Sequence, residues 1–290
     1  MLLSTDDSFG VYKRIGRDPC GSLWFQKFTR GCHNRMGDEQ RTNKALSIPL
    51  LKALLRSIEE NIRHAEEPGD KHAWIIVSCY VAVCYVISLR GNKAFLLDLG
   101  GLQRHWQFKN EESFIIALRG KIKGEKHDLE HLIPCINTTS TGIPVKAIVK
   151  RLMKFQKLRN RVKGPALTDY SGKTMPASQV DRFLLECLSE IYSNDKSLFH
   201  IDIQRKLNGK EHESQSILKL HYSCFRTFRR TSNTRAMEVQ DRLKDDDIDI
   251  VNKWRAKESA KGKRPTNKMR QHYAEIEVLL RPFLRYTKAM

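Results

Sequence analysis

Acidic residues are scarce in this sequence, which has 33 Asp and Glu against 52 Lys and Arg over its 290 residues. The difference gives a formal net charge of +19 at pH 7. Hydrophobic residues nevertheless make up 40% of the chain, which is typical of a folded protein and not of a disordered one. An excess of basic residues leaves two interpretations, a solvated basic surface or a polyanionic partner. Because these residues are clustered in the sequence, we favour nucleic acid as the partner.

Closely paired cysteines are also missing. The seven cysteines are odd in number and show no repeated Cys-x-x-Cys spacing, so we expect free thiols in a reducing compartment. Cys20, Cys32 and His33 offer three zinc ligands, but no tight pair anchors a zinc site there. We therefore predict no zinc.

No apolar run has the length of a membrane span. A spanning helix needs roughly 20 apolar residues, and the uncharged run over 73–89 is shorter and ends at Arg90. We expect a buried core helix there and no membrane partner. The first residues lack a basic segment followed by an apolar one, so we also expect no secretory signal.

Several enzyme signatures are absent as well. No Gly-rich phosphate loop precedes a predicted helix, and neither His-Glu-x-x-His nor Gly-x-Ser-x-Gly occurs. Asp245–Asp247 and Asp249 offer carboxylates for Mg²⁺, as in a metal-dependent nuclease. Stabilisation of a helix N-terminus also accounts for these acids. We predict no metal and no cofactor.

Helical periodicity dominates what the sequence does contain. Two strand-like runs over 113–122 and 130–136, joined by a polar turn, predict one β-hairpin. Helices are predicted from Ser47 and Pro49 onward, from Asp70 onward, and over 144–163, 177–193 (with Ser178 as N-cap), 245–256 and 269–286. The sequence thus predicts a mainly α fold with a small antiparallel β-sheet, of the α+β class.

The helix over 144–163 is basic and amphipathic. One face is apolar, and eight Lys and Arg between Lys146 and Lys163 occur without any acid. Calmodulin or an anionic membrane is an alternative target for such a helix. In a chain this basic throughout we favour the DNA backbone. The residues predicted to contact DNA phosphates are Lys146, Lys150, Arg151, Lys154 and Lys157.

A second basic segment, HYSCFRTFRRTSNTRA (221–236), holds four arginines and no acid. Arg226, Arg229 and Arg230 are spaced i, i+3 and i+4, so we expect them on one helical face. Like charges this close repel each other and require an anion that the segment itself lacks. A phosphodiester is one such anion. Arginine binds it through two parallel hydrogen bonds, lysine protonates a leaving oxygen and tyrosine is a nucleophile.

Five features in this order resemble the motifs of the tyrosine recombinase superfamily. ISLRGNKAFLLDLGGL (87–102) resembles its first arginine box, and the hairpin with Lys123 in its turn resembles its catalytic-lysine hairpin. FRTFRRTSNTRA (225–236) is similar to the second arginine box. Trp254 and then Tyr273 follow, where that family has His or Trp and its nucleophile. Together with RMGDEQRTNKALS (35–47), the sequences of these motifs are most similar to those of the crypton-type recombinases of eukaryotic mobile elements.

The resemblance implies a role for each of these residues. Arg90 and Arg229 would hold the scissile phosphate, and Lys123 would protonate the leaving 5′-oxygen. Trp254 would pack against the phosphate or donate to it. Tyr273 would attack and form a 3′-phosphotyrosyl link, with metal and cofactor unnecessary.

The resemblance also implies an organisation and a cellular setting. Residues 46–290 would be a tyrosine recombinase catalytic domain, and residues 1–45 a linker or the remnant of a core-binding domain. The partner would be double-stranded DNA, bound by a dimer or tetramer. The location would be nuclear in a eukaryote and otherwise cytoplasmic. Arg230 and Arg235 would face flanking phosphates, and Tyr286 is the rival candidate for the nucleophile.

Two departures from the family pattern weaken the enzyme prediction. Lys93 stands where the family usually has an acid that supports the first arginine. Arg226 stands where it usually has a histidine. An alternative function is therefore a weakened or inactive recombinase-derived protein that binds DNA without cutting it. A type IB topoisomerase, which shares the chemistry, is a third.

Overall fold

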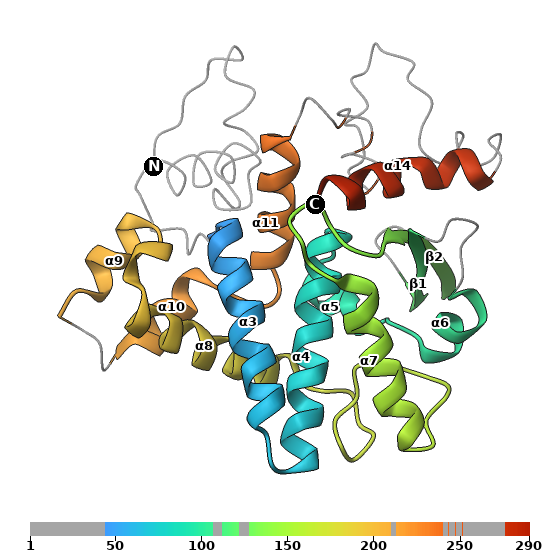
Figure 1. Cartoon of the computed structure of the whole chain (residues 1–290), viewed down its shortest axis with the longest axis horizontal. Coiled ribbons are helices and arrows are strands. Elements are labelled where there is room, and N and C mark those ends of the chain that lie inside the picture. The colour runs from blue at the N-terminus through green and yellow to red at the C-terminus, as the bar shows by residue number, and fades with distance from the viewer. Residues whose placement is uncertain are drawn as a thin grey trace, which may run out of the picture. The chain divides into compact units, whose positions relative to one another are not determined.

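The structure is a computed structural model that describes residues 44–106, 112–121, 128–209, 213–239 and 276–290, together with positions 243, 247 and 251. Within α14, side chains are described from Arg281 onward. The segment Asn43–Met290 forms one compact unit (Figure 1). The predicted helix over 245–256 lies almost wholly outside the described residues.

The described residues are mainly helical and contain one small antiparallel sheet, which confirms the predicted α+β class. The first helices and the two strands are α3 (Ile48–His64), α4 (Pro68–Val86), α5 (Gly91–Ala94), α6 (Leu99–His105), β1 (Ser113–Gly120) and β2 (Leu129–Ile136). The later helices are α7 (Val145–Leu158), α8 (Ala177–Asn194), η3 (Lys196–Leu198), α9 (Ile201–Leu207), α10 (Ser214–His221), α11 (Thr227–Glu238) and α14 (Ile276–Ala289).

Helix α4 is the centre of the core. Its residues from His72 to Val86 are all buried, and the helix contacts α3, α7, α8 and α11. Figure 1 shows α4 running between α3 and α7. Its apolar residues occupy every face of the helix, so the prediction of a buried core helix is confirmed. Within the described residues, no helix has both the length and the apolarity of a membrane span.

The predicted hairpin is confirmed. Strands β1 and β2 pair antiparallel, from Ser113 opposite Ile136 to Gly120 opposite Leu129. Helix α6 packs on β1, and α14 packs on β2. Backbone hydrogen bonds also tie β1 to the α5–α6 connection, because Arg119 N–H donates to the Leu96 carbonyl over 2.7 Å. The turn that carries Lys123 lies outside the described residues.

Helix boundaries agree with the sequence in some places and differ in others. Ser47 caps α3 by accepting from Leu50 N–H over 3.3 Å, as predicted. The predicted cap at Ser178 is wrong, because α8 begins at Ala177 and Pro176 takes the N-cap position. The predicted helix over 144–163 is too long, since α7 ends at Leu158.

A tertiary contact explains why α7 ends early. The Arg159 guanidinium donates to the backbone carbonyls of Asp169 and Tyr170, and Asn160 has a left-handed φ of 57°. These contacts turn the chain away from the helix axis. The contacted residues follow in the next loop, so the periodicity of 144–163 holds no sign of them.

A buried histidine joins α4 to the end of α7. His72 is fully buried, its ring stacks on Phe155 with centroids 4.9 Å apart, and its Nδ1 lies 3.3 Å from Nη1 of Arg159. A guanidinium only donates, so this nitrogen accepts and carries no proton. Burial first, and then the charges of Arg159 and Arg161, lower the pKa of His72 to about 4. His72 is therefore neutral at pH 7.

We expect His72 to make folding sensitive to mild acid. Its pKa is 6.5 in the unfolded chain and about 4 in the folded one. Between these values the unfolded chain binds the extra proton, so stability is lost as the pH falls from 6.5 towards 4. The loss reaches at most about 3 kcal/mol. In urea unfolding at several pH values, His72→Gln should flatten this dependence. His64→Gln, at the exposed end of α3, should retain it. A His72→Gln profile parallel to the parent profile contradicts the assignment.

Candidate functional site

The two arginine segments, far apart in sequence, lie against each other in the structure. Gly91 N–H donates to the Phe225 carbonyl over 3.1 Å, which joins the residue after Arg90 to the residue before Arg226. The approach leaves no room for a side chain at position 91. A Cβ there would lie 2.6 Å from the Cys224 carbonyl oxygen and collide with the Tyr80 hydroxyl. A glycine after Arg90 is thus a condition for bringing the two segments together.

Arg90 and Arg229 occupy one electrostatic neighbourhood. Arg90 is exposed at the N-cap position of α5, and Arg229 is half-buried in the first turn of α11. The pKa of Arg229 is lowered, first by burial and then by the positive charge of Arg90, while the Tyr286 phenol acts in the opposite sense. An anion beside both guanidiniums would offset the second of these causes, the repulsion from Arg90. The pair therefore has the electrostatics of an anion site.

The N-terminus of α11 strengthens this positive region. It has no side-chain cap and no acid in its first turn, so the partial positive charge of the helix dipole is not offset there. Arg226 and Arg230 are both exposed beside it. The prediction that Arg226, Arg229 and Arg230 share one helical face is wrong for Arg226. Its backbone is non-helical, with φ −129° and ψ −29°, and it precedes the helix as its N-cap.

Lys93 has a contact that the sequence did not indicate. Its Nζ donates to the Lys121 carbonyl over 2.6 Å, which ties α5 to the residue after β1. Asp98, the nearby acid, caps α6 by accepting from Gly101 N–H over 2.7 Å. Lys93 therefore links the first arginine segment to the hairpin, and its expected role as a lost support for Arg90 stays a prediction.

The structure describes only part of the predicted catalytic set. Lys123, Trp254 and Tyr273 lie outside the described residues. The rival tyrosine, Tyr286, is fully buried, and its hydroxyl lies 2.9 Å from Ser232 Oγ. These contacts link α14 to α11, and the phenol also lies close enough to Arg229 to raise the pKa of that arginine. Tyr286 therefore stays the rival prediction for the nucleophile.

The residues predicted to contact DNA differ in whether they are exposed or paired with an acid of the protein. Lys150, Lys154 and Lys157 are exposed and follow one another along α7 at helical spacing, and Lys146 on the same stripe is half-buried. Arg151 instead forms a two-point ion pair with Glu59 of α3, so its charge is already offset.

Arg235 resembles Arg151 in this respect. Its Nη1 lies 3.4 Å from a carboxylate oxygen of Glu238, one turn further along α11. The predicted set thus consists of four lysines in a largely exposed stripe on α7, the exposed Arg230 in the first turn of α11, and two arginines, Arg151 and Arg235, that hold acids of the protein itself. We name Lys146, Lys150, Lys154 and Lys157 the α7 lysine stripe.

The described residues offer little to a metal ion. No group of three or more His, Cys, Asp or Glu suited to a metal occurs among them. Asp247, one of the acids considered for Mg²⁺, is buried and accepts two hydrogen bonds from Arg285, at 2.9 and 2.5 Å. The cysteines within the described ranges are free and buried, as predicted. The trio considered for zinc lies outside those ranges.

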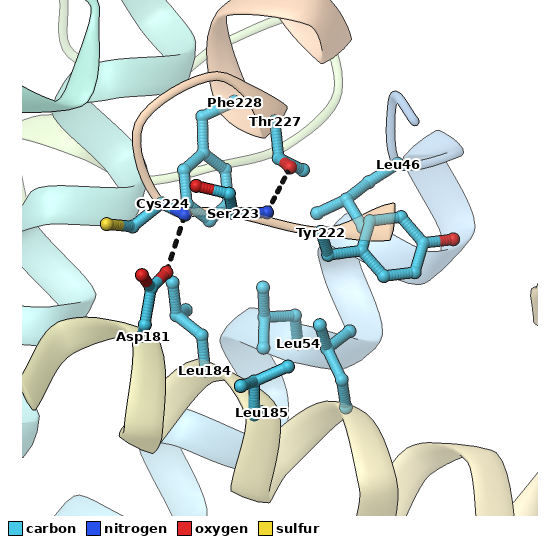
Figure 2. Close-up of a pocket in the computed structure, with 11 residues that line it drawn as sticks. Leu46, Leu54, Asp181, Leu184, Leu185, Tyr222, Ser223, Cys224, Thr227 and Phe228 are labelled. Carbon is cyan, nitrogen blue, oxygen red and sulfur yellow. Dashed lines mark hydrogen bonds between the residues drawn. The ribbon is translucent and has the colours of Figure 1, made fainter. Parts of the chain in front are cut away.

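Sequence reasoning missed the residues that hold the second arginine segment. The Tyr80 hydroxyl donates to the Cys224 carbonyl over 2.9 Å, and a carboxylate oxygen of Asp181 accepts from Cys224 N–H over 2.7 Å. Figure 2 shows Asp181 below the backbone of Cys224. Tyr80 was identifiable only as a core residue, and the pattern around Asp181 holds no signal of its contact.

Neither comparison with known proteins assigns a family, since no family model matches the chain and the search of curated proteins finds no match. The resemblance to tyrosine recombinases therefore stays a prediction from the order of the sequence motifs.

We predict that Gly91→Ala destabilises the fold by about 1–3 kcal/mol, because the added methyl must displace the Tyr80 hydroxyl or the Cys224 backbone. The free energy of unfolding in urea measures this. Gly69→Ala is the matched control, because nothing lies within 4 Å of the added atom and alanine is the better helix former. It should be neutral or stabilising. Equal stability of the two variants is the outcome against this account.

Lys93→Glu tests whether position 93 lacks an acid that would support Arg90 or instead needs a donor to the Lys121 carbonyl. If an acid were missing there, this change would raise stability by supporting Arg90. The structure predicts the reverse, a loss of about 1 kcal/mol, because a donor to the Lys121 carbonyl becomes an acceptor. Lys93→Arg retains a donor and should remain close to the parent in urea unfolding. A more stable Lys93→Glu variant refutes the assigned contact.

Proposed function

We propose that this protein is a DNA-breaking and DNA-joining enzyme of the tyrosine recombinase type. The single observation that carries the proposal is the juxtaposition of the two arginine segments through Gly91 and Phe225. The resemblance requires these segments, distant in sequence, to form one phosphate site. An unrelated basic protein has no reason to pair them at the expense of charge repulsion.

The proposed chemistry uses residues of the chain alone. Arg90 and Arg229 hold the non-bridging oxygens of the scissile phosphate, and Trp254 packs against it. The Tyr273 hydroxyl loses its proton to solvent and its oxygen forms a bond to phosphorus as the bond to the 5′-oxygen breaks, and Lys123 gives that 5′-oxygen its proton. A 5′-hydroxyl of a partner strand later reverses the step. The energy of the broken bond remains in the phosphotyrosyl link.

The position of the hairpin supports this arrangement. Lys93 lies three residues after Arg90, and it contacts Lys121, two residues before Lys123. The start of the hairpin turn is thus tied to the helix that follows the first arginine. This supports a catalytic lysine approaching the phosphate from the hairpin side.

Double-stranded DNA is the proposed partner, bound by a dimer or tetramer, in the nucleus if the host is a eukaryote. The net charge of +19 and the α7 lysine stripe support backbone contacts. Six to ten such contacts would cost on the order of 10³–10⁵ in affinity between 50 and 200 mM salt. A type IB topoisomerase would share this chemistry.

Arg226 favours a second candidate, a recombinase-derived protein that binds DNA and cuts it slowly or not at all. A histidine at this position can accept a proton, whereas arginine remains protonated in proteins. Loss of general-base help costs roughly 10²–10⁴ in rate. The exposed Arg226 would still add positive charge beside the phosphate.

The test is a covalent protein–DNA adduct. The protein is incubated in EDTA with a nicked suicide duplex, and the denatured mixture is separated on a gel. We expect a shifted band that Tyr273→Phe abolishes while duplex binding remains nearly intact. Tyr286→Phe is the control and should retain the band. Salt-dependent binding without any band favours the second candidate. A band that survives Tyr273→Phe contradicts the proposed nucleophile, and the absence of binding contradicts both candidates.

A further inference from the structure

The turn before α11 decides where Arg229 stands. Ser223 N–H donates to Thr227 Oγ1 over 2.9 Å, and Thr227 N–H donates to the Ser223 carbonyl over 3.0 Å, so the turn leads tightly into the helix. Figure 2 shows this turn and the start of α11 above α8. A rigid link of this kind passes any displacement at Cys224 on to the first helical turn. Whatever holds Cys224 therefore holds Arg229.

Two side chains from different helices hold Cys224. Asp181 on α8 accepts from its N–H, and Tyr80 on α4 donates to its carbonyl. The next carbonyl, that of Phe225, accepts from Gly91. Three polar groups of two adjacent backbone residues thus find partners on three separate elements, α8, α4 and α5. Such a set fixes the orientation of the turn, and not only its position.

Packing holds the turn from below as well. Its residues Tyr222, Cys224, Thr227 and Phe228 are buried, and the cavity under them, about the size of one water molecule, is lined by leucines and by the turn itself. Figure 2 shows Leu184 and Leu185 facing the backbone of the turn. The hydrogen bonds add a fixed orientation to this packing.

The Asp181 carboxylate has no other evident purpose in its helix. It lies beyond the first turn of α8, which contains no acid, and the N-cap residue of α8 is Pro176. A hydrogen bond to an ionised acceptor is roughly twice as strong as one between neutral groups. A carboxylate at this position is thus well suited to restraining a single backbone N–H.

We infer that Asp181 is a positioning residue for the phosphate site: by holding Cys224 N–H, it sets the turn that places Arg229 beside Arg90. The inference rests on the proposed function in one respect, namely that Arg229 binds a phosphate of DNA. Asp181 itself touches no substrate. Its effect on DNA binding must therefore pass through Arg229, and this distinguishes it from a residue that only stabilises the fold.

The experiment is a double-mutant cycle on duplex binding, measured in EDTA at fixed salt with Asp181→Ala, Arg229→Ala and the double variant. We expect each single change to weaken binding roughly tenfold, the loss of one charge-assisted contact. The double variant should match Arg229→Ala within about twofold, because Asp181 has nothing left to position. The slope of log K against log salt should fall by about 1 in each of the three variants. A double variant weakened about a hundredfold overturns the inference.

Matched variants separate the positioning role from a general effect of lost charge or lost stability. Glu186→Ala removes a carboxylate from the same helix, one that pairs with Arg182, and it should leave binding unchanged. Lys150→Ala in the α7 lysine stripe should combine additively with Asp181→Ala, since the stripe does not act through the turn. Asp181→Asn keeps an acceptor oxygen and should recover most of the affinity. A loss equal to that of Asp181→Ala would count against the hydrogen bond.

A second variant decides the matter if Asp181→Ala does not fold. Tyr80→Phe deletes only the hydroxyl that donates to the Cys224 carbonyl. Tyr80→Phe should weaken DNA binding in the parent protein but cause no further loss in the Arg229→Ala variant. If the losses from Tyr80→Phe and Arg229→Ala are additive, the inference is overturned. If Arg229→Ala alone leaves binding unchanged, the proposed function fails instead. If Arg229→Ala weakens binding and Asp181→Ala does not, only the positioning role fails.

Discussion

The close approach of Gly91 to the backbone of Cys224 and Phe225 is the constraint on which the rest of the site depends. Two guanidiniums repel each other, by about 4 kcal/mol at 4 Å for an effective dielectric constant of 20. No attraction between the side chains themselves can bring Arg90 and Arg229 into one region. Backbone contact does so, and it is possible only where the residue after Arg90 has no side chain. The positions of the two positive charges are thus set by steric fit. An incoming anion reduces the repulsion that remains between them.

That fit requires a rigid platform, and α4 supplies it. Its surface, buried from His72 to Val86, fixes the Tyr80 hydroxyl, which meets both Gly91 and the Cys224 carbonyl. Polar groups in such a core are held in place because an unsatisfied hydroxyl there costs about 1–3 kcal/mol. The same helix carries Arg90 just beyond its C-terminal end. One core helix therefore sets the position of both arginine segments.

The local features of this fold could be predicted from the sequence, whereas the long-range contacts could not. The uniform apolarity of α4, the two strand-like runs of the hairpin and the helix start at Ser47 are local patterns, and the structure confirms each of them. The end of α7, the contact of Lys93 and the contact of Asp181 each depend on a backbone group remote in sequence. A backbone carbonyl or N–H leaves no trace in residue identity, so no periodicity reveals such a contact. The arginine spacing indicated an anion site, but not that Arg226 would stand outside the helix.

On the proposed function, burial divides the work of DNA binding between two regions. The α7 lysine stripe is largely exposed, so its charges are well hydrated and gain little from any single phosphate. Arg229 has already lost part of its hydration, and its lowered pKa reflects that loss together with the charge of Arg90. A phosphate placed there offsets the repulsion from Arg90 and meets a guanidinium that is less screened by water, so it gains more free energy than one on the stripe. The stripe would then attract and orient the duplex, while the arginine pair selects the one phosphate that is presented to the nucleophile.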